Sequence, residues 1–421
     1  MNILLIGSGG RESAFAWKLH QSPLLEKLYI SPGNPGTEQF GTNVNIDIDN
    51  IEELVGFITK SNIEMVIIGP EEPLVNGIYD KLKTLLPKLK IIGPSKRGAM
   101  LEGSKAYAKE FMKEFGIPTA DYKVFNKQQK EDAFHFIDTI KTPIVIKADG
   151  LAGGKGVIIT EDKDQAKKDI ADIFDGKFGS AGDNVIIEEF LDGVEYSVFV
   201  ITDSKSYKML PIAKDYKRVG LADTGLNTGG MGAISPVSFI NDDLLIKTVV
   251  KIIQPTISGI WQKDIDYKGF IFFGLTNVNG DPYVIEYNCR MGDPESEVVF
   301  PRLKNDLVKL LNSLYTNDIS EHTIEHESNY AVTVMLTSSN YPENYETGKE
   351  IKNLDKIEDS IIFHAGTKKE DGKILTNGGR VLTVTSLAKK KEDALLQSLK
   401  NANLIDFDNK YFRDDIGFDV E

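Results

Sequence analysis

The sequence predicts a multidomain protein that combines α/β and α+β units. Its 421 residues correspond to roughly two to four domains of about 100–200 residues each. Short apolar runs alternate with helical patterns over residues 1–95, strand-rich patterns dominate residues 194–300, and the pattern changes again near residue 328. These observations predict an N-terminal doubly wound parallel sheet, a larger central unit and a small C-terminal α+β domain.

Residues 1–95 show the alternation of strands and helices that is typical of a parallel sheet. The predicted strands cover residues 3–6, 28–30, 65–68 and 91–92, and the predicted helices cover residues 12–20, 51–60 and 74–86. Gly or Pro follows each predicted strand, and ligands of such sheets bind beyond the carboxyl ends of the strands. We therefore expect a binding site at this edge of the sheet.

The rest of the chain is predicted from shorter patterns. Ser104 is a suitable N-cap for an amphipathic helix over residues 104–116, which Ile117-Pro118 ends. The central segment also contains a predicted helix over residues 163–174 and a predicted strand over residues 185–189. The C-terminal domain has predicted strands over residues 330–336, 361–364 and 380–385 and a predicted helix over residues 392–401.

Composition and charge exclude several classes of function. The formal net charge is −14, whereas proteins that bind nucleic acid or anionic membranes broadly need a basic face. Cys289 is the single cysteine, so no internal disulfide can form. No apolar run approaches the ~18 residues of a membrane span, and residues 1–7 have the pattern of a buried strand and not of a signal peptide. We expect a cytoplasmic protein whose partners are small molecules, with no nucleic acid and no membrane.

The most informative segment is the strand–loop–strand pattern over residues 144–157. An apolar run delivers Lys147, and the loop that follows contains Gly150, Gly153, Gly154, Lys155 and Gly156. Glycine lets backbone N–H groups approach phosphate oxygens, and lysine adds positive charge. A Walker loop has Gly-Lys-Ser/Thr at the start of a helix, whereas here Lys155 precedes Gly156 and an apolar strand. The segment therefore predicts a nucleotide phosphate lid of another kind.

The turn over residues 7–12, Gly-Ser-Gly-Gly-Arg-Glu, follows one predicted strand and opens a helix. Helix N–H groups at such a turn can hold a phosphate or a carboxylate. Dinucleotide binding is one interpretation, but Glu12 replaces the third glycine of G-x-G-x-x-G, and residues 30–32 supply no acid for a ribose. Arg11 and Glu12 are better suited to a smaller ligand with a phosphate and hydroxyl groups.

Three further segments place polar groups at strand ends or beside glycines. Glu71 in Gly69-Pro70-Glu71 either accepts hydrogen bonds from sugar hydroxyls or is an acid favoured at a helix N-terminus. Residues 186–195 run from a strand into an acidic loop, where backbone groups suit an adenine edge and Glu195 suits a ribose. Residues 220–232 contain five glycines, which predicts either a loop that wraps a small anion or a mobile surface loop.

The strand over residues 283–290 carries the sharpest signal. Because side chains alternate along a strand, Glu286, Asn288 and Arg290 are expected to share one face. The other face is expected to carry Ile285, Tyr287 and Cys289. One carboxylate and one amide oxygen two residues apart suit Mg²⁺, which keeps waters and phosphate oxygens as its other ligands. Arg290 can clamp a carboxylate or a phosphate beside that metal, and Cys289 is interpreted as a packing residue.

Taken in this order, the motifs resemble those of the ATP-grasp superfamily and, more closely, those of the phosphoribosylamine–glycine ligase family. The resemblance covers nearly the whole chain, and the shared order of the motifs makes it specific. The motifs are Gly7 to Glu12, Gly69-Pro70-Glu71, Leu101 to Lys105, Ile146 to Gly150, Lys155-Gly156-Val157, Glu188 to Leu191, Lys217 to Gly220, Asn227 to Gly232, Glu286 to Arg290, His364 to Thr367 and Asn377 to Arg380.

The resemblance implies an ATP-grasp core of two α+β subdomains and a ligase reaction. Glycine would be joined to 5-phosphoribosylamine through glycyl phosphate, giving glycinamide ribonucleotide, ADP and phosphate in de novo purine (IMP) biosynthesis. The implied cofactors are ATP and Mg²⁺ or Mn²⁺. The implied domains are an N-terminal substrate-binding domain (1–103), an ATP-grasp domain (104–327) with a mobile lid over residues 120–192, and a C-terminal domain (328–421).

The resemblance also implies roles for individual residues. ATP would contact Lys105, Lys147, Gly153, Gly154, Lys155, Gly156, Glu188, Glu189, Phe190, Leu191 and Glu195. Glycine would contact Asp215, Arg290, Gly229, Gly230, Met231 and Gly232. Phosphoribosylamine would contact Gly9, Gly10, Arg11, Glu12, Glu71 and Arg380. The metal would be held by Glu286 and Asn288, and the catalytic residues would be Lys147, Arg290 and Asp215.

Three residues depart from the family pattern, and several alternatives stay open. Ser8 and Ser13 replace the familiar Asn and His of the first motif, and Tyr216 replaces a frequent His.

A protein that is a dehydrogenase using NAD would rest on residues 7–12 alone, and a nucleotide sensor would keep the ATP motifs without catalysis. A different ATP-grasp ligase is the strongest rival. We expect a monomer, with a weak homodimer as the alternative.

Overall fold

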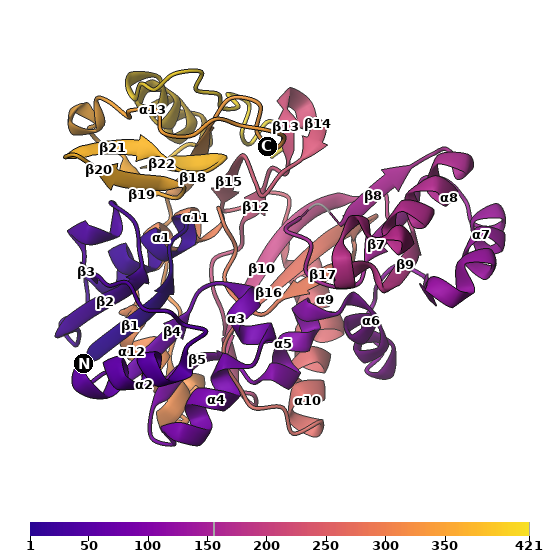
Figure 1. Cartoon of the computed structure of the whole chain (residues 1–421), viewed down its shortest axis with the longest axis horizontal. Helices are drawn as coiled ribbons and strands as arrows, with labels where there is room; N and C mark the ends of the chain where they lie inside the picture. Colours follow the sequence, from indigo (N-terminus) through magenta and orange to yellow (C-terminus); the bar gives the residue numbers. More distant parts are fainter. Residues whose placement is uncertain (155, 421) are drawn as a thin grey trace.

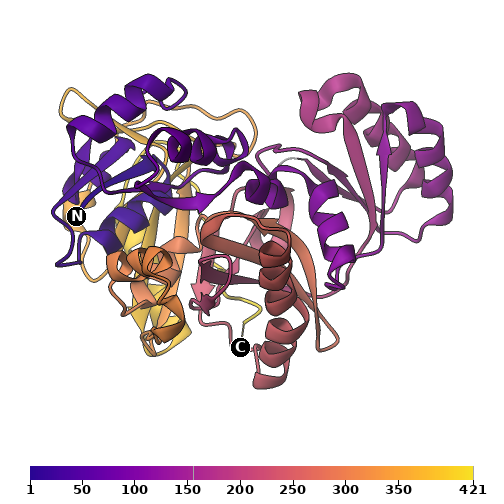
Figure 2. The same cartoon turned by 90° about the horizontal axis from the view of Figure 1, so that it is seen from below.

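The computed structural model describes residues 1–154 and 156–420, which form three large sheets with helices around them (Figure 1). The largest sheet has nine strands and joins the N-terminal and central parts of the chain. A four-stranded sheet forms one end of the molecule, and a five-stranded sheet contains the C-terminal strands (Figures 1 and 2). This arrangement confirms the predicted combination of α/β and α+β units.

The N-terminal part of the nine-stranded sheet is parallel, as predicted. Its strands are β1 (Asn2–Gly7), β2 (Lys27–Pro32), β3 (Thr42–Asn43), β4 (Met65–Ile68) and β5 (Lys90–Pro94). They lie in the order β5-β4-β1-β2-β3, and every neighbouring pair is parallel. The strand order therefore reverses between β1 and β4, and ligands of such sheets bind at this kind of switch point.

Helices cover both faces of the parallel sheet. They are α1 (Gly10–Leu19), α2 (Ile51–Lys60), α4 (Ile78–Leu85), α5 (Lys96–Gly103) and α12 (Leu307–Thr316). Because alternate side chains of β1 point to opposite faces, Leu4 and Ile6 belong to the core with α2, α4 and α5. Ile3 and Leu5 belong to the core with α1 and α12. Helix α12 follows the central strands in sequence but completes the N-terminal unit in space (Figure 1).

The single helix predicted over residues 74–86 is wrong, because the structure has two helices there. Helix α3 (Glu71–Val75) ends before Gly77, and α4 begins after it. Gly77 has a φ of +83°, a left-handed conformation that ends an α-helix and that glycine adopts easily. The break lets α3 start directly after β4, so Glu71 stands at the edge of the sheet.

The central part of the sheet is antiparallel and is joined to the N-terminal part through one strand. Its strands are β10 (Val194–Thr202), β11 (Tyr207–Met209), β16 (Tyr267–Val278) and β17 (Asp281–Asn288). Strand β16 runs antiparallel to β5, where Tyr267 pairs with Pro94 and Lys268 pairs with Gly93. Strand β17 runs antiparallel to β16, so it points in the same direction as β5. The carboxyl ends of β17 and of the parallel strands therefore lie at the same edge.

Helices also cover the central sheet. They are α6 (Lys105–Glu114), α9 (Asp242–Thr248) and α10 (Gln254–Gln262), and a π-helical turn (Val249–Ile253) joins α9 to α10. Helix α11 (Ser296–Arg302) packs instead against α1 and the C-terminal sheet. Within the described residues, the helical run 242–262 is the one that is long and apolar enough to cross a membrane by length and composition. Ile252, Ile257 and Ile260 of this run are buried in the core, so it packs as a core helix of the central sheet.

The four-stranded sheet forms a unit of its own. Its strands are β6 (Tyr122–Asn126), β7 (Ile144–Ala148), β8 (Val157–Thr160) and β9 (Asn184–Glu189), and its helices include α7 (Lys130–Thr139) and α8 (Lys163–Asp172). The strands pair in the antiparallel order β6-β9-β7-β8. Ile137, Ile146 and Ile170 belong to a hydrophobic cluster that is separate from the other cores. Figure 2 shows that this unit extends away from the rest of the molecule.

The C-terminal sheet includes two strands from the central part of the chain. Its strands are β12 (Lys214–Asp215), β15 (Gly232–Ser235), β18 (Tyr330–Thr337), β19 (Ile361–His364) and β22 (Arg380–Ala388), in the antiparallel order β12-β15-β18-β22-β19, and α13 (Lys391–Leu404) packs against it. Two hairpins lie outside these sheets, β13 (Arg218–Gly220) with β14 (Thr224–Asn227) and β20 (Thr367–Glu370) with β21 (Lys373–Thr376). Because β12 and β15 flank the hairpin β13–β14 in sequence, that hairpin is rooted in the C-terminal sheet.

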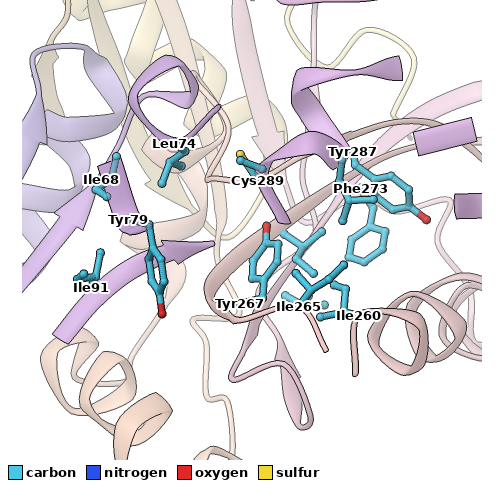
Figure 3. Close-up of a cluster of buried hydrophobic side chains, with 14 of the residues drawn as sticks. Ile68, Leu74, Tyr79, Ile91, Ile260, Ile265, Tyr267, Phe273, Tyr287 and Cys289 are labelled. Carbon is cyan, nitrogen blue, oxygen red and sulfur yellow. The ribbon is translucent and has the colours of Figure 1, made fainter. Parts of the chain in front are cut away.

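One hydrophobic core connects the N-terminal and central parts of the large sheet. Figure 3 shows side chains from both parts in this cluster, among them Ile68 and Leu74 on one side and Tyr267 and Phe273 on the other. The ring centroids of Phe273 and Tyr287 lie 5.5 Å apart, and the ring planes form an angle of 72°. Aromatic pairs favour this edge-to-face arrangement. The core therefore helps to fix the orientation of the strands that carry the site.

Replacement of Phe273 by alanine tests this core. Phe273 is 0% exposed, and Phe273→Ala is expected to lower the free energy of unfolding by about 3–5 kcal/mol, because it removes buried apolar area and leaves a cavity. Urea denaturation followed by circular dichroism measures the change. Leu396 is 69% exposed, so Leu396→Ala should change the free energy by no more than about 0.5 kcal/mol. Equal effects of the two substitutions would contradict the assignment.

Candidate active site

A cavity of about 710 Å³ is lined by residues from the N-terminal, four-stranded, central and C-terminal units, and we call it the cleft. The predicted site residues in its lining are Arg11, Glu71, Lys105, Lys147, Gly153, Gly154, Gly156, Glu188, Glu189, Phe190, Leu191, Glu195, Asp215, Gly229, Glu286, Asn288, Arg290 and Arg380. Among the described residues, the predicted ones outside the lining are Gly9, Gly10, Glu12, Gly230, Met231 and Gly232. Lys155 lies outside the described residues.

Two buried lysines meet at one carboxylate on the floor of the four-stranded unit. Lys147 on β7 places its Nζ 2.9 Å from Glu188 Oε2, and Lys109 on α6 places its Nζ 3.2 Å from Glu188 Oε1. Lys147 also donates a hydrogen bond to Ile285 O at 3.3 Å. Burial lowers the pKa of Lys109 to about 8, although Glu188 acts in the opposite direction. Lys147 therefore links the four-stranded unit to the strand that carries Glu286.

Lys105 holds the start of the glycine loop. Its Nζ donates hydrogen bonds to Gly150 O at 3.0 Å and to Asp149 O at 3.3 Å. Ser104, the N-cap of α6, donates from Oγ to Asp149 Oδ1 at 2.9 Å. Burial lowers the pKa of Lys105, against the effect of Glu286. The loop is thus anchored to α6 where it leaves β7.

The glycine loop needs its glycines for backbone geometry. Gly153 and Gly154 have φ values of +56° and +76°, which residues with a side chain rarely adopt. A methyl group at Gly154 would lie 3.8 Å from Thr228 O, so the loop faces the root of the hairpin β13–β14 across the cleft. Backbone N–H groups in such a loop can bind phosphate oxygens.

Strand β17 contains a bulge that the sequence did not predict. Val284 pairs with Leu275 and Glu286 pairs with Gly274, so Ile285 is the extra residue. The prediction that Ile285 shares a face with Tyr287 and Cys289 is therefore wrong, because a bulge resets the alternation of side chains. Ile285 is half-buried and lies outside the hydrophobic core, and Val284 takes its place there with Tyr287 and Cys289.

Glu286 and Asn288 provide oxygen atoms suited to a hard cation. Both residues line the cleft, and neither side chain forms an ion pair or a hydrogen bond with another described residue. Mg²⁺ binds one or two protein carboxylate or amide oxygens and completes its shell with water and phosphate oxygens. Within the described residues, no group of three or more His, Cys, Asp or Glu residues could hold a metal. The pair therefore fits a metal that arrives with a phosphate ligand.

Arg290 is held between two carboxylates from the N-terminal unit. Its Nε donates to Glu71 Oε2 at 3.1 Å, and its other end lies 2.9 Å from Glu102 Oε1. Although burial opposes the shift, the charges of Arg290 and Arg11 lower the pKa of Glu71 to about 2. Burial raises the pKa of Glu102, against the effect of Arg290. These ion pairs fix the end of β17 against α3 and α5.

The predicted phosphate turn lies beside this cluster. Arg11 donates from Nε to Glu12 Oε1 at 2.6 Å, and its guanidinium lies 4.0 Å from Glu71. The other oxygen of Glu12 accepts a hydrogen bond from Gly9 N at 2.7 Å. Arg11 reaches the cleft, whereas Glu12 is 2% exposed and braces the turn from behind.

A second group of charges lies on the wall formed by β10 and β12. Lys217 Nζ lies 2.9 Å from Glu195 Oε2. Although burial opposes the shift, Asp215, Glu195 and Glu286 raise the pKa of Lys217 well above its ordinary value. Burial raises the pKa of Asp215, and Lys217 opposes that shift. Lys217 therefore stays charged beside two carboxylates and a candidate metal ligand.

In the loop over residues 229–232, one residue lines the cleft and the others lie outside its lining. Gly229 lines the cleft, and its carbonyl oxygen accepts a hydrogen bond from Arg380 at 2.6 Å. Arg380 also lies 3.0 Å from Asp293 Oδ1. Met231 is 0% exposed, and Gly232 is part of β15. The loop thus presents one residue to the cleft and anchors the next ones in the C-terminal sheet.

Two of the three residues that depart from the family pattern form hydrogen bonds within this chain. Ser13 donates from Oγ to His364 O at 2.6 Å, which joins α1 to the C-terminal domain. Tyr216 donates from Oη to Asp419 Oδ1 at 2.7 Å. Ser8 is exposed at the start of α1. The first two replacements therefore form structural contacts and leave no buried polar group of these side chains unpaired.

Sequence reasoning missed several charged residues of the cleft. Lys109 is four residues after Lys105 on the same helix, a spacing that places both on one face and that offered a usable signal. Glu102 and Lys217 belong to motifs that were quoted for the resemblance without a role. Asp293 carries no local signal, because its importance comes from Arg380, which lies far away in the sequence.

Models of the phosphoribosylglycinamide synthetase family match three consecutive parts of the chain. The N domain of the family matches residues 1–102, the ATP-grasp (A) domain matches residues 103–296, and the C domain matches residues 331–419. The chain belongs to the phosphoribosylglycinamide synthetase family. The family's ATP-grasp domain contains the predicted ATP and metal residues, and the lining of the cleft also includes Arg11 and Glu71 from its N domain and Arg380 from its C domain.

Relatives of similar length support this membership. The phosphoribosylamine–glycine ligase of Fusobacterium nucleatum is 42% identical over 422 residues, which cover 99% of this chain and 98% of that protein. The enzyme of the same name from Haemophilus influenzae is 43% identical over 424 residues, with coverage of 99% and 98%.

Solved structures show the same architecture. The phosphoribosylamine–glycine ligase of Thermotoga maritima has a TM-score of 0.86 and 35% sequence identity, and the match covers 99% of this chain and 100% of that one. The biotin carboxylase domain of 2-oxoglutarate carboxylase from Hydrogenobacter thermophilus has a TM-score of 0.74 and 16% identity, with 98% and 91% coverage. The second likeness shows the fold alone.

The low pKa of Glu71 predicts a pH dependence of stability. Its pKa is about 2 in the folded protein and about 4.5 ordinarily, so its ion pairs stabilise the fold above pH 4.5 and are lost as the pH falls towards 2. The free energy of unfolding of wild type should therefore exceed that of Glu71→Gln at pH 7, and the difference should shrink between pH 4.5 and pH 2. Chemical denaturation across this range measures it.

Glu72 provides the matched control for that prediction. It is the next residue, and it is exposed, so Glu72→Gln should change the free energy of unfolding at pH 7 by no more than about 0.5 kcal/mol. A Glu71→Gln difference that stays constant from pH 7 to pH 2 would refute the ionic role of Glu71.

Proposed function

We propose that this chain joins glycine to 5-phosphoribosylamine with ATP, through glycyl phosphate, and releases glycinamide ribonucleotide, ADP and phosphate in de novo purine (IMP) biosynthesis. Family membership over nearly the whole chain supports the reaction class. The single observation that carries the proposal is the contact across the cleft, where Lys147 donates a hydrogen bond to Ile285 O, the residue before Glu286. This contact supports one shared site for the proposed nucleotide lysine and the proposed metal ligands.

We assign ATP to the side of the cleft next to the four-stranded unit. Lys105 and Lys147 would approach the phosphates from α6 and β7, and the glycine loop would cover them. The segment from Glu188 to Leu191, where β9 ends, would hold adenine, and Glu195 would hold the ribose. Phe190 is 39% exposed, which leaves an apolar surface free for a base to pack against.

Glu286 and Asn288 are the residues that would hold Mg²⁺, or Mn²⁺ in its place. When bound, the metal neutralises charge on the phosphate oxygens during phosphoryl transfer. The lysines contribute the remaining positive charge. An acidic protein with a net charge of −14 needs such a local concentration of cations to bind a polyphosphate.

The two other substrates are assigned to the opposite side of the cleft. Asp215, Arg290 and the loop over residues 229–232 would surround glycine. Arg11, Glu71 and Arg380, with the turn at Gly9, Gly10 and Glu12, would hold phosphoribosylamine. Arg290 also donates from NH1 to Met291 O at 3.2 Å. The N–H groups that Glu71, Glu102 and Met291 leave free are available to a carboxylate, and a planar guanidinium matches that geometry.

The chemistry needs an activated carboxylate and not a side-chain nucleophile. A free carboxylate is a poor acceptor for an amine, and transfer of the γ-phosphoryl group to it supplies a leaving group. Lys147 and the loop N–H groups orient the phosphates, and closure of the loop keeps water from the reactive glycyl phosphate. The amine of phosphoribosylamine then attacks the carbonyl carbon, and phosphate leaves.

Cys289 does not fit the role of a nucleophile. Its Sγ lies 3.1 Å from Glu102 Oε2 and is buried behind the cleft-facing side of β17. Burial and the neighbouring Glu102 raise the pKa of its thiol well above the ordinary value, so the reactive thiolate is disfavoured.

The proposal also places the protein in the cytoplasm as a monomer, or as a weak homodimer, without nucleic acid or membrane as a partner.

Phosphate release tests the reaction directly. Purified protein with Mg²⁺ and ATP should release phosphate in a manner that depends on glycine and on phosphoribosylamine generated in the assay. Hydroxylamine should trap glycine hydroxamate when phosphoribosylamine is absent, because the acyl phosphate is then intercepted. ATP binding with no glycine-dependent phosphate release would favour a nucleotide sensor, and a covalent glycyl-enzyme would overturn the direct mechanism.

Glu286→Ala tests the metal assignment. We expect kcat to fall by at least about a hundredfold while the melting temperature stays near that of wild type, because a metal ligand is lost and the fold is not. Steady-state phosphate release measures kcat. Asp281 lies at the other end of the same strand, so Asp281→Asn should retain near-normal kcat. Near-normal turnover of Glu286→Ala at ordinary Mg²⁺ would remove Glu286 from the metal site.

A further inference from the structure

The last residues that the structure describes, 411–420, lie against the hairpin β13–β14 and end at the cleft. Tyr411 donates a hydrogen bond from Oη to Val219 O at 2.8 Å. At the other end of the segment, Asp419 lines the cleft and lies 3.2 Å from Lys214 Nζ. Figure 1 shows the C-terminal segment beside the two strands of the hairpin. The function described above gives this segment no role.

Arg413 is the centre of the contact. Its side chain is 0% exposed, and it donates from Nε and NH2 to the two oxygens of Asp415 at 2.7 and 2.9 Å. Its NH1 donates to Asp223 Oδ1 at 2.7 Å and to Arg218 O at 3.0 Å, both in the hairpin. The guanidinium also lies over the ring of Tyr216 at 5.3 Å. A buried arginine destabilises a protein unless its donors are paired, and here two carboxylates pair it.

The same contacts hold the two strained residues of the hairpin. Ala222 and Asp223 have φ values of +48° and +54°, a region that residues other than glycine seldom occupy without support from their surroundings. Ala222 N donates to Asp415 Oδ2 at 2.6 Å, and Asp223 accepts from Arg413. The C-terminal segment therefore stabilises the turn that its sequence alone would not favour.

The root of the hairpin is the wall that faces the glycine loop. Thr228 donates from N and from Oγ1 to Lys217 O at 2.7 and 2.8 Å, and Lys217 pairs with Glu195. Thr228 O also lies within van der Waals distance, 3.8 Å, of a Cβ placed on Gly154 across the cleft. A shift of the hairpin would therefore move the wall against which the glycine loop lies and the partner of the proposed ribose ligand.

We propose that residues 411–420 form a C-terminal strut that fixes the hairpin β13–β14 as the stationary wall of the nucleotide site, with Arg413 as its positioning residue. The strut acts on nucleotide affinity, because the glycine loop can close over ATP only against a wall in the correct place. This inference rests on the proposed function, which assigns ATP to that side of the cleft. Arg413 does not touch the substrate.

Two conservative substitutions test the strut. Arg413→Lys keeps the charge but loses the bidentate fork, and Asp415→Asn keeps the shape but loses the charge. Each should raise the KM for Mg·ATP, and the dissociation constant of Mg·ATP measured by calorimetry, by about tenfold, because the hairpin that forms the wall is then held less firmly. Both should leave kcat within about threefold of wild type. Asp414 is the exposed neighbour, and Asp414→Asn should match wild type in all three quantities.

The outcomes separate the strut from the proposed function. Unchanged KM and unchanged nucleotide affinity in both variants would overturn the strut. A fall in kcat with unchanged KM would also overturn it, because a smaller folded fraction would then explain the loss. If wild type binds Mg·ATP but shows no glycine-dependent phosphate release, the proposed reaction fails, and the calorimetric comparison still decides the strut.

Discussion

The direction of strand β17 is the constraint on which the cleft depends. Two residue pairs join β16 to β5, and β17 follows antiparallel to β16, so β17 ends at the same edge as the parallel strands. Arg290, just beyond that end, is then held by Glu71 and Glu102. A buried charge that loses its partner costs several kcal/mol, so these ion pairs hold the metal strand in register with the N-terminal unit.

Carboxylates organise the cations of the cleft and do not merely oppose them. Glu188 spaces Lys147 and Lys109, and Glu195 holds Lys217. Each lysine side chain therefore has a defined position before any ligand arrives. Positive charge that is already in place stabilises an incoming phosphate without further reorganisation. The same carboxylates limit the repulsion among lysines that would otherwise accumulate in a buried space.

The sequence predicted the parallel sheet and the polar face of β17 because both follow from local periodicity. The alternation of apolar and polar residues placed Glu286, Asn288 and Arg290 on one face. The bulge at Ile285 was not predictable in this way, since it exists only in the pairing with β16. The contacts of Glu102 and Asp293 also come from distant segments, and single-sequence patterns carry no information about them. Gly77 was a signal for a break between two helices, but the helical spacing of the apolar residues around it favoured a single helix over residues 74–86.

The two glycine-rich loops of the cleft differ in how they are held, and this difference suits a site that must open and close. The hairpin β13–β14 is tied to the C-terminal segment at Val219, Ala222 and Asp223. The described residues of the glycine loop are anchored at Gly150, which accepts from Lys105, and at Gly156, which accepts from Ala148 N. The four-stranded unit that carries the loop extends away from the rest of the molecule (Figure 2). Each segment that becomes ordered on binding reduces affinity through lost conformational entropy. A wall that is already fixed confines that entropy loss to one loop, and on the proposed function the loop that moves is the one that shields glycyl phosphate from water.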